Sequence, residues 1–178
     1  ARTADWFVSG EADRLALAQP VDFEVKARAV LADLGFTLTA KADRIDVAAD
    51  GRAYIYDYKT GLPPSPSEQR YFDKQLLLEA AMAENGDFEG LGPALVAEAV
   101  YLGLGSKPVT VAASLQDESP TQVWEAFHAL IKAYQDPTQG YTARRAMQSD
   151  KTPGDYDQLA RFGEWDVTVA AKAQVVKP

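Results

Sequence analysis

The stretch that decides the fold is residues 42–61, which read ADRIDVAADGRAYIYDYKTG. Residues 53–59 (AYIYDYK) are apolar and aromatic, and they predict a strand. Residues 35–48 contain alternating apolar side chains and predict a second strand. Asp50 and Gly51, which lie between the two, are a strong signal for a tight turn. We therefore predict a β-hairpin that carries acidic residues on both arms.

The second arm of this hairpin carries an acid and a base on one face. Asp57 and Lys59 are two residues apart, so their side chains project together, while Tyr54, Tyr56 and Tyr58 point to the other face. Such a pair is often only a surface ion pair. A further acid on the preceding strand favours a catalytic interpretation, in which two carboxylates hold a hard divalent cation. The lysine would then orient and acidify a water molecule that attacks a phosphodiester.

The identity of the second acid depends on the parity of the hairpin loop. A two-residue turn would put Arg44 opposite Asp57 and leave Asp46 on the same face, one step away. A three-residue loop, with Gly51 in the left-handed position of a bulge, would put Asp43 opposite Asp57 instead. The residue pattern by itself leaves both alternatives open.

The rest of the sequence predicts a mixed α/β fold, a central sheet flanked by helices. Ser65, Pro66 and Glu68 form a capping box that begins a helix, and Gly86 ends it. On the first strand, Val21, Phe23, Val25 and Ala27 are predicted to face inward. The predicted helices are 4–15, 66–84, 120–135 and 155–162. The predicted strands are 21–29, 35–48, 53–59, 94–103 and 109–111. Residues 138–154 are predicted to be irregular, and the tail from 167 is predicted to be an edge strand or a loose end.

Composition narrows the class of protein. The chain has 178 residues, 47% of them hydrophobic and 25% charged, which suits one globular domain. It has no cysteine and a single histidine, so any metal must be held by oxygen ligands. The net charge of −8 argues against a general nucleic-acid-coating protein, although it leaves room for a nuclease whose partner supplies phosphate contacts. No signal peptide or membrane span is predicted, and we expect a cytoplasmic protein.

The run ADRID…YIYDYKTG, followed by QLLLEAAM, resembles the RecB-like PD-(D/E)XK nucleases. It resembles more closely the C-terminal nuclease domain of AddB, a subunit of the AddAB helicase–nucleases, in its alphaproteobacterial form. FVSGEADR near the start and PGDYDQLARFGEW near the end are also similar to that domain, so the resemblance covers most of the chain.

The resemblance implies a restriction-endonuclease-like core and a single nuclease domain over residues 1–178, cut from a longer subunit. It implies a Mg²⁺- or Mn²⁺-dependent exonuclease that acts on DNA in double-strand break repair, beside an AddA-type helicase–nuclease subunit. An inactive nuclease-fold module that binds DNA or scaffolds the partner is the alternative. A stand-alone Cas4-like exonuclease is disfavoured because the cysteines are missing.

The resemblance also assigns roles to residues. It makes Asp43 and Asp57 the metal ligands, together with the main-chain carbonyl of Tyr58, and it makes Lys59 the catalytic lysine. Gln75 falls on the helix position of the RecB-like Q-xxx-Y motif.

This sequence departs from the family pattern at several positions. Residue 79 is Glu where the broader motif has Tyr, and no cysteine is present to bind an iron–sulfur cluster. The histidine that several relatives carry on the first helix is missing, and Glu11 is a candidate acidic substitute. Arg70 and Lys74 form a basic stripe that is predicted to contact DNA phosphates or simply to face solvent.

Overall fold

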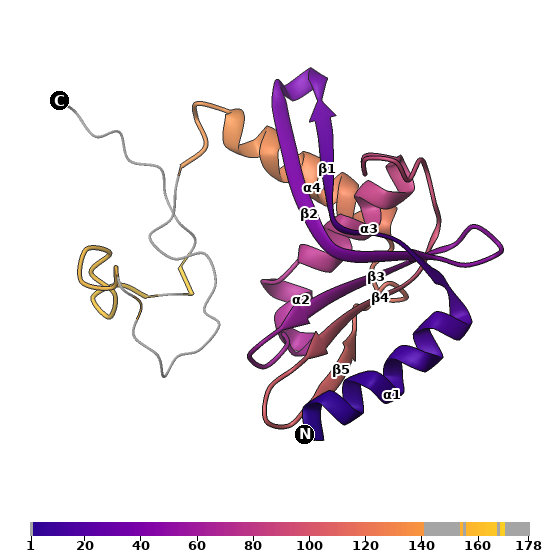
Figure 1. The fold of residues 1–178 in the computed structure, drawn as a ribbon. Coiled ribbons are helices and arrows are strands. Elements are labelled where there is room, and N and C mark those ends of the chain that lie inside the picture. Colours follow the sequence, from indigo (N-terminus) through magenta and orange to yellow (C-terminus); the bar gives the residue numbers. More distant parts are fainter. Residues whose placement is uncertain (1, 141–153, 155, 167, 170–178) are drawn as a thin grey trace. The chain divides into compact units, whose positions relative to one another are not determined.

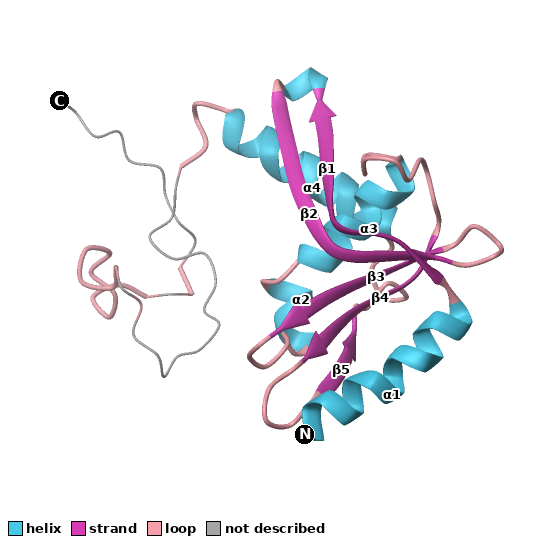
Figure 2. Ribbon diagram, viewed as in Figure 1, coloured by secondary structure: helices cyan, strands magenta, loops and turns pink. Residues whose placement is uncertain are grey.

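The structure is a computed structural model, and it describes residues 2–140, 154, 156–166 and 168–169. The chain divides into two compact units, Ala1–Ala129 and Leu130–Pro178. The first unit holds the whole sheet (Figures 1 and 2). The helices are α1 (Arg2–Leu17), α2 (Pro66–Tyr71), α3 (Gln75–Asn85) and α4 (Pro120–Gln135), with a short 3₁₀ helix, η1 (Ala32–Leu34). The strands are β1 (Gln19–Leu31), β2 (Phe36–Val47), β3 (Ala53–Lys59), β4 (Val96–Gly103) and β5 (Val109–Ala112).

The five strands form one mixed sheet in the order β1-β2-β3-β4-β5. The pairs β1–β2, β2–β3 and β4–β5 are antiparallel, whereas β3 and β4 are parallel. The parallel pair requires a crossover, which α2 and α3 supply. The predicted mixed α/β sheet with flanking helices is therefore confirmed. None of the described helices is long and apolar enough to cross a membrane.

The two faces of the sheet are covered by different helices. The α3 face carries the larger core, which includes Ile45, Ile55, Ala80, Met82 and Tyr101. The opposite face packs against α1, with a smaller core built from Ala18, Tyr54, Tyr56, Val100 and Leu102. Successive residues of β3 thus alternate between the α1 face and the α3 face, as a strand requires.

The β2–β3 hairpin has odd parity. Arg44 pairs with Tyr56, and the register continues without a shift to the end of the ladder. The backbone hydrogen bond of Ala48 N–H to Arg52 O, 2.9 Å long, closes a three-residue loop. The last loop residue, Gly51, has φ of 83°, which is the left-handed conformation. Continued one step outward, this register places residue 43 opposite residue 57.

The first strand differs from its prediction at its beginning. Val25 and Ala27 are buried as expected, but Val21 and Phe23 are 51% and 57% exposed. The register between β1 and β2 shifts between the second and fourth residues of β1, and Glu24 has φ of 54°. The register shift precedes Phe23, so the change of face between the exposed Phe23 and the buried Val25 falls at Glu24, whose left-handed backbone interrupts the alternation.

The helix predicted over 66–84 is two helices, α2 and α3, separated by residues 72–74. The capping box at the start of α2 is confirmed. The break is stabilised by Asp73, whose Oδ1 accepts a 2.6 Å hydrogen bond from the Tyr101 hydroxyl and a 3.3 Å bond from Gln75 N–H. This break makes Gln75 the first residue of α3.

In the second unit, the helix predicted over 155–162 is wrong. Described residues 156–163 form turns. Arg161 and Gly163 have left-handed φ values of 51° and 95°, which a continuous α-helix does not permit. Most of the predicted irregular region 138–154, and most of the tail from 167, lie outside the described residues.

Candidate active site

Asp43 on β2 reaches across to the end of β3. Its Oδ2 accepts a hydrogen bond of 2.9 Å from the backbone N–H of Tyr58. This contact fixes the Asp43 carboxylate beside the two residues that flank Tyr58, which are Asp57 and Lys59. The odd parity of the hairpin is what brings Asp43, and not Asp46, to this position.

Asp57 and Lys59 are paired at the end of β3, on the α3 face. Lys59 Nζ lies 2.9 Å from Asp57 Oδ2 in an ion pair. Asp57 is only 4% exposed, so its charge is largely removed from water. A buried carboxylate is unfavourable unless a cation or hydrogen-bond donors face it, and Lys59 supplies part of this compensation.

The amide group of Gln75, at the start of α3, joins this pair to the helix. Its Nε2 donates to Asp57 Oδ1 at 2.6 Å and to Glu79 Oε1 at 3.2 Å. Its Oε1 accepts from Lys59 Nζ at 2.9 Å. The amide orientation is determined by these partners, because the flipped amide would put its NH₂ against the ammonium and its oxygen against the carboxylate.

Glu79 lies one turn further along α3 and is buried, with 4% exposure. Burial raises the pKa of Glu79 to about 7, the hydrogen bond from Gln75 opposes this rise, and the negative charge of Asp57 adds to it. Glu79 Oε2 is buried and accepts no hydrogen bond from any described residue. The cluster therefore contains a carboxyl group that gains or loses its proton near neutral pH.

An aromatic ring completes the surroundings of Lys59. Its Nζ lies 5.4 Å from the centroid of the Tyr101 ring, within the range of a cation–π contact. Burial and the hydrogen bond to Asp73 raise the pKa of Tyr101, so its hydroxyl stays protonated and donates to Asp73. Lys59 is thus held by a carboxylate, an amide oxygen and a ring.

The donor set at this end of the sheet suits a hard cation. Asp57 Oδ2 is buried and, apart from its ion pair with Lys59, has no hydrogen-bond partner among the described residues. No group of three or more Asp, Glu, His or Cys side chains in the described part of the chain is arranged to hold a metal ion. Mg²⁺ is usually bound through one or two carboxylates plus water and substrate phosphate, so the pair Asp43 and Asp57 fits Mg²⁺.

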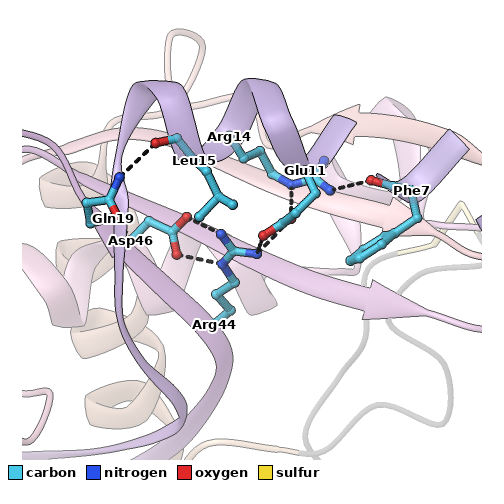
Figure 3. A network of polar contacts seen from close by, with 7 residues as sticks. All are labelled: Phe7, Glu11, Arg14, Leu15, Gln19, Arg44 and Asp46. Atoms are coloured by element: carbon cyan, nitrogen blue, oxygen red, sulfur yellow. Dashed lines mark hydrogen bonds and ion pairs between the residues drawn. The ribbon is translucent and has the colours of Figure 1, made fainter. Parts of the chain in front are cut away.

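Asp46, the alternative second acid, belongs to a different network on the α1 face (Figure 3). Arg44 Nε and Nη2 each donate to the Asp46 carboxylate at 2.6 Å. Both residues are buried, with 2% and 0% exposure. Because its two oxygens are occupied by the Arg44 guanidinium, Asp46 is not available as a metal ligand in this structure.

The candidate accessory role of Glu11 is not supported by its position. Glu11 accepts hydrogen bonds of 2.7 and 2.9 Å from Arg44 Nη1, and it also contacts Arg14 at 3.0 Å (Figure 3). Burial alone would raise the pKa of Glu11, but the hydrogen bonds from the two arginines lower it overall. Glu11 lies on α1, so it joins the helix to β2 on the face opposite to Asp57.

The two residues of the predicted basic stripe, Arg70 and Lys74, have different partners in the structure. Lys74 forms an ion pair with Glu118, so its charge is already neutralised. The Arg70 guanidinium lies 5.4 Å from the centroid of the Tyr71 ring, and no described carboxylate forms an ion pair with it. Arg70 is therefore the better candidate of the two for a phosphate.

The structure brings together Asp43, Asp57, Lys59 and Gln75, as expected for one site, and their catalytic roles stay predictions. The candidate set omitted Glu79 and Tyr101. The spacing of four residues between Gln75 and Glu79 was the available signal for the first, because it puts both on one helix face. No sequence signal places Tyr101 against Lys59, since that contact depends on the parallel pairing of β3 and β4.

Comparison with known proteins agrees with this geometry. No curated protein matches the sequence. A model of the PD-(D/E)XK nuclease superfamily matches residues 1–166, which is nearly the whole chain. The mixed sheet with flanking helices is consistent with the restriction-endonuclease-like fold of that group. The chain therefore belongs to the PD-(D/E)XK nuclease superfamily.

Proposed function

We propose that the chain is a Mg²⁺-dependent deoxyribonuclease domain that hydrolyses phosphodiester bonds as an exonuclease. Membership of the superfamily implies a nuclease with DNA as its substrate, and such nucleases generally use Mg²⁺ or Mn²⁺. The observation that carries the proposal is the bonded set of Asp57, Lys59 and Gln75 next to the Asp43 carboxylate.

Asp43, Asp57 and the main-chain carbonyl of Tyr58 would hold the ion. When bound, the ion would supply positive charge that favours the hydrolysis of a phosphodiester at this site. The chain's own contribution is to fix the two carboxylates, one through the Tyr58 N–H and the other through the Gln75 amide.

Lys59 would orient the attacking water molecule and stabilise the negative charge that develops on the phosphate oxygens. Its ammonium group is already held by Asp57, Gln75 and the Tyr101 ring, so little reorganisation is needed when substrate arrives. Prearranged positive charge in a site with low exposure is worth more than the same charge in water.

We propose in addition that this nuclease is of the AddB type. It would be one domain, over residues 1–178, of a cytoplasmic helicase–nuclease that resects double-strand breaks beside an AddA-type subunit. The support is the similarity of the segments at residues 7–14, 42–61 and 153–165 to that domain. The absence of cysteine excludes a thiolate-bound iron–sulfur cluster in this chain.

The alternative is an inactive nuclease-fold module that only binds DNA or scaffolds its partner. The buried state of Asp57 argues against it. Asp57 is 4% exposed and its charge is offset only by Lys59 and the Gln75 amide, an arrangement that destabilises a fold unless the buried charge has a function.

The test is cleavage of end-labelled single- and double-stranded DNA by the 178-residue chain, with Mg²⁺ and with EDTA. Lys59→Ala is expected to lower the cleavage rate by about 10²- to 10³-fold, because it removes a positioned electrostatic contact. Asp57→Ala should lower the rate similarly and also weaken Mg²⁺ binding, which isothermal titration calorimetry can measure. Lys26→Ala is the matched control, since Lys26 is an exposed lysine on β1.

Wild-type DNA binding without Mg²⁺-dependent cleavage would favour the inactive module. Unchanged cleavage in Lys59→Ala would overturn the proposed catalytic role. The AddB assignment is tested separately, by co-purification of the chain with an AddA-type subunit. Failure of the two to associate would contradict that assignment and leave the nuclease activity itself unaffected.

A further inference from the structure

A cavity of about 900 Å³ lies outside the catalytic cluster, within the first unit. Its walls come from α2, from Leu77 of α3, and from residues between β5 and α4, including Ser114 and Asp117. Its size is that of a small-molecule site and exceeds that of one nucleotide base with its sugar. None of the residues that bind Asp57 or Lys59 lines it.

The wall of this cavity is anchored by a buried amide group, that of Gln69. Gln69 is 2% exposed, and its Nε2 donates to Pro64 O at 3.2 Å and to Ala112 O at 3.4 Å. Its Oε1 is buried and accepts no hydrogen bond from any described residue. The two bonds of Nε2 tie α2 to the end of β5 and so hold Arg70 and Tyr71, the next two residues of α2, in the cavity wall.

The other walls suit a planar aromatic ligand that carries a negative charge. The Tyr71 ring lines the cavity and is 64% exposed, an unusual exposure for an aromatic side chain. The Arg70 guanidinium lies over this ring, 5.4 Å from its centroid, where it can contact an anion next to a stacked ring. Asp117 offers an acceptor for N–H groups of a base, whereas Glu118 is paired with Lys74.

We propose that this cavity binds an unpaired base of single-stranded DNA, next to the strand position that is cleaved. The base would stack on Tyr71, and Arg70 would contact its phosphate. The proposal rests on the nuclease function argued above. The cavity lies near the catalytic cluster, because Tyr71 and Gln75 are four residues apart and their Cα atoms are therefore at most about 14 Å apart.

The experiment measures binding of a short fluorescein-labelled oligonucleotide to the full 178-residue chain in EDTA, where no cleavage occurs. The second ligand is the same oligonucleotide with abasic residues throughout. Tyr71→Leu should weaken binding of the normal strand by about 5- to 100-fold, the range for loss of one base–aromatic stack. The abasic strand should bind equally to wild type and variant, because it offers nothing to stack.

Tyr71→Leu is chosen because Tyr71 is exposed, whereas a change at Gln69 also removes contacts that tie α2 to β5. Tyr156→Leu is the matched control, since Tyr156 is 74% exposed and lies in the second unit. It should bind both strands as wild type does. Arg70→Ala should reduce the slope of log K against log salt by about 0.7, the value for one phosphate contact on a single strand.

Equal binding of the normal strand by wild type and Tyr71→Leu would overturn the proposal, as would an equal loss on the abasic strand. Binding of deoxyadenosine monophosphate as tightly as the oligonucleotide would also overturn it, in favour of a free nucleotide site. These outcomes are distinguishable from failure of the nuclease function. In that case wild type itself would not cleave DNA in Mg²⁺, whatever the behaviour of the Tyr71 variant.

Discussion

Asp43 and Tyr58 are joined by a hydrogen bond of 2.9 Å, from the Tyr58 backbone N–H to Asp43 Oδ2. The two residues lie on neighbouring strands, and the contact fixes a carboxylate between the positions of Asp57 and Lys59. Asp46 lies three residues further along β2, yet its carboxylate is on the other face, bound to Arg44. The two acids of one short motif therefore have different surroundings and different expected roles.

This difference predicts opposite effects for two matched substitutions. Asp43→Asn keeps an acceptor for the Tyr58 N–H but removes the charge, so Mg²⁺-dependent cleavage should fall by about 10²-fold with little change in stability. Asp46→Asn breaks a buried ion pair and should lower the free energy of unfolding by about 3–5 kcal/mol. Urea denaturation and a cleavage assay on both variants check this, and the reverse pattern would make Asp46 the ligand.

Gln75 is expected to matter for both activity and stability. Gln75→Leu keeps the side-chain volume but removes partners from Asp57 and Lys59, so both groups lose their fixed positions. We expect a loss of about 1–3 kcal/mol in stability, the usual effect of an unsatisfied buried group, and at least about tenfold slower cleavage. Gln19→Leu is the control, because that amide bonds only to the exposed carbonyl of Leu15. Equal cleavage by the two variants would contradict the bridging role.

The raised pKa of Glu79 predicts how stability depends on pH in the absence of metal. Its pKa is about 7 in the folded chain and near 4.5 when unfolded, so folded Glu79 holds its proton more tightly. The contribution of Glu79 to the free energy of unfolding is therefore largest below pH 4.5. It falls by about 3 kcal/mol in total as the pH rises through 7.

Glu79→Gln should remove that decline, because glutamine carries no titrating proton. The measurement is urea denaturation of wild type and variant in EDTA at several pH values between 4.5 and 8. Glu125→Gln, at an exposed position on α4, should keep the wild-type pH dependence. The prediction fails if wild type and Glu79→Gln lose stability in parallel over this range.

Glu11 tests the separation between the two faces of the sheet. Glu11→Gln removes a charged partner from the buried Arg44 and should lower stability by about 1.5–3 kcal/mol. It should not change the Mg²⁺ concentration that gives half-maximal cleavage, because Glu11 lies on the α1 face. A tenfold rise in that concentration in the Glu11→Gln variant would contradict this and support a role for Glu11 in metal binding.

The sequence alone was sufficient to predict the features that depend on residues close together along the chain. The alternation in 53–59 predicted β3 and the shared face of Asp57 and Lys59, and the capping box fixed the start of α2. The start of a helix and the faces of a strand are set by local hydrogen bonds and sterics, which short sequence patterns encode. The break between α2 and α3 was missed because Asp73 is held by Tyr101, a residue of β4.

The sequence by itself determined that the chain carries two acids and a lysine on a β-hairpin. Only the tertiary structure decided which acid belongs to the site, because Asp43 and Asp46 differ in the helix that covers their face of the sheet. Likewise, Gln75 and Glu79 are near each other by helical spacing alone, but their contact with Asp57 requires the packing of α3 on β3. Burial, which sets the pKa of Glu79 and the energetic meaning of each ion pair, is a property of that packing and not of any short segment.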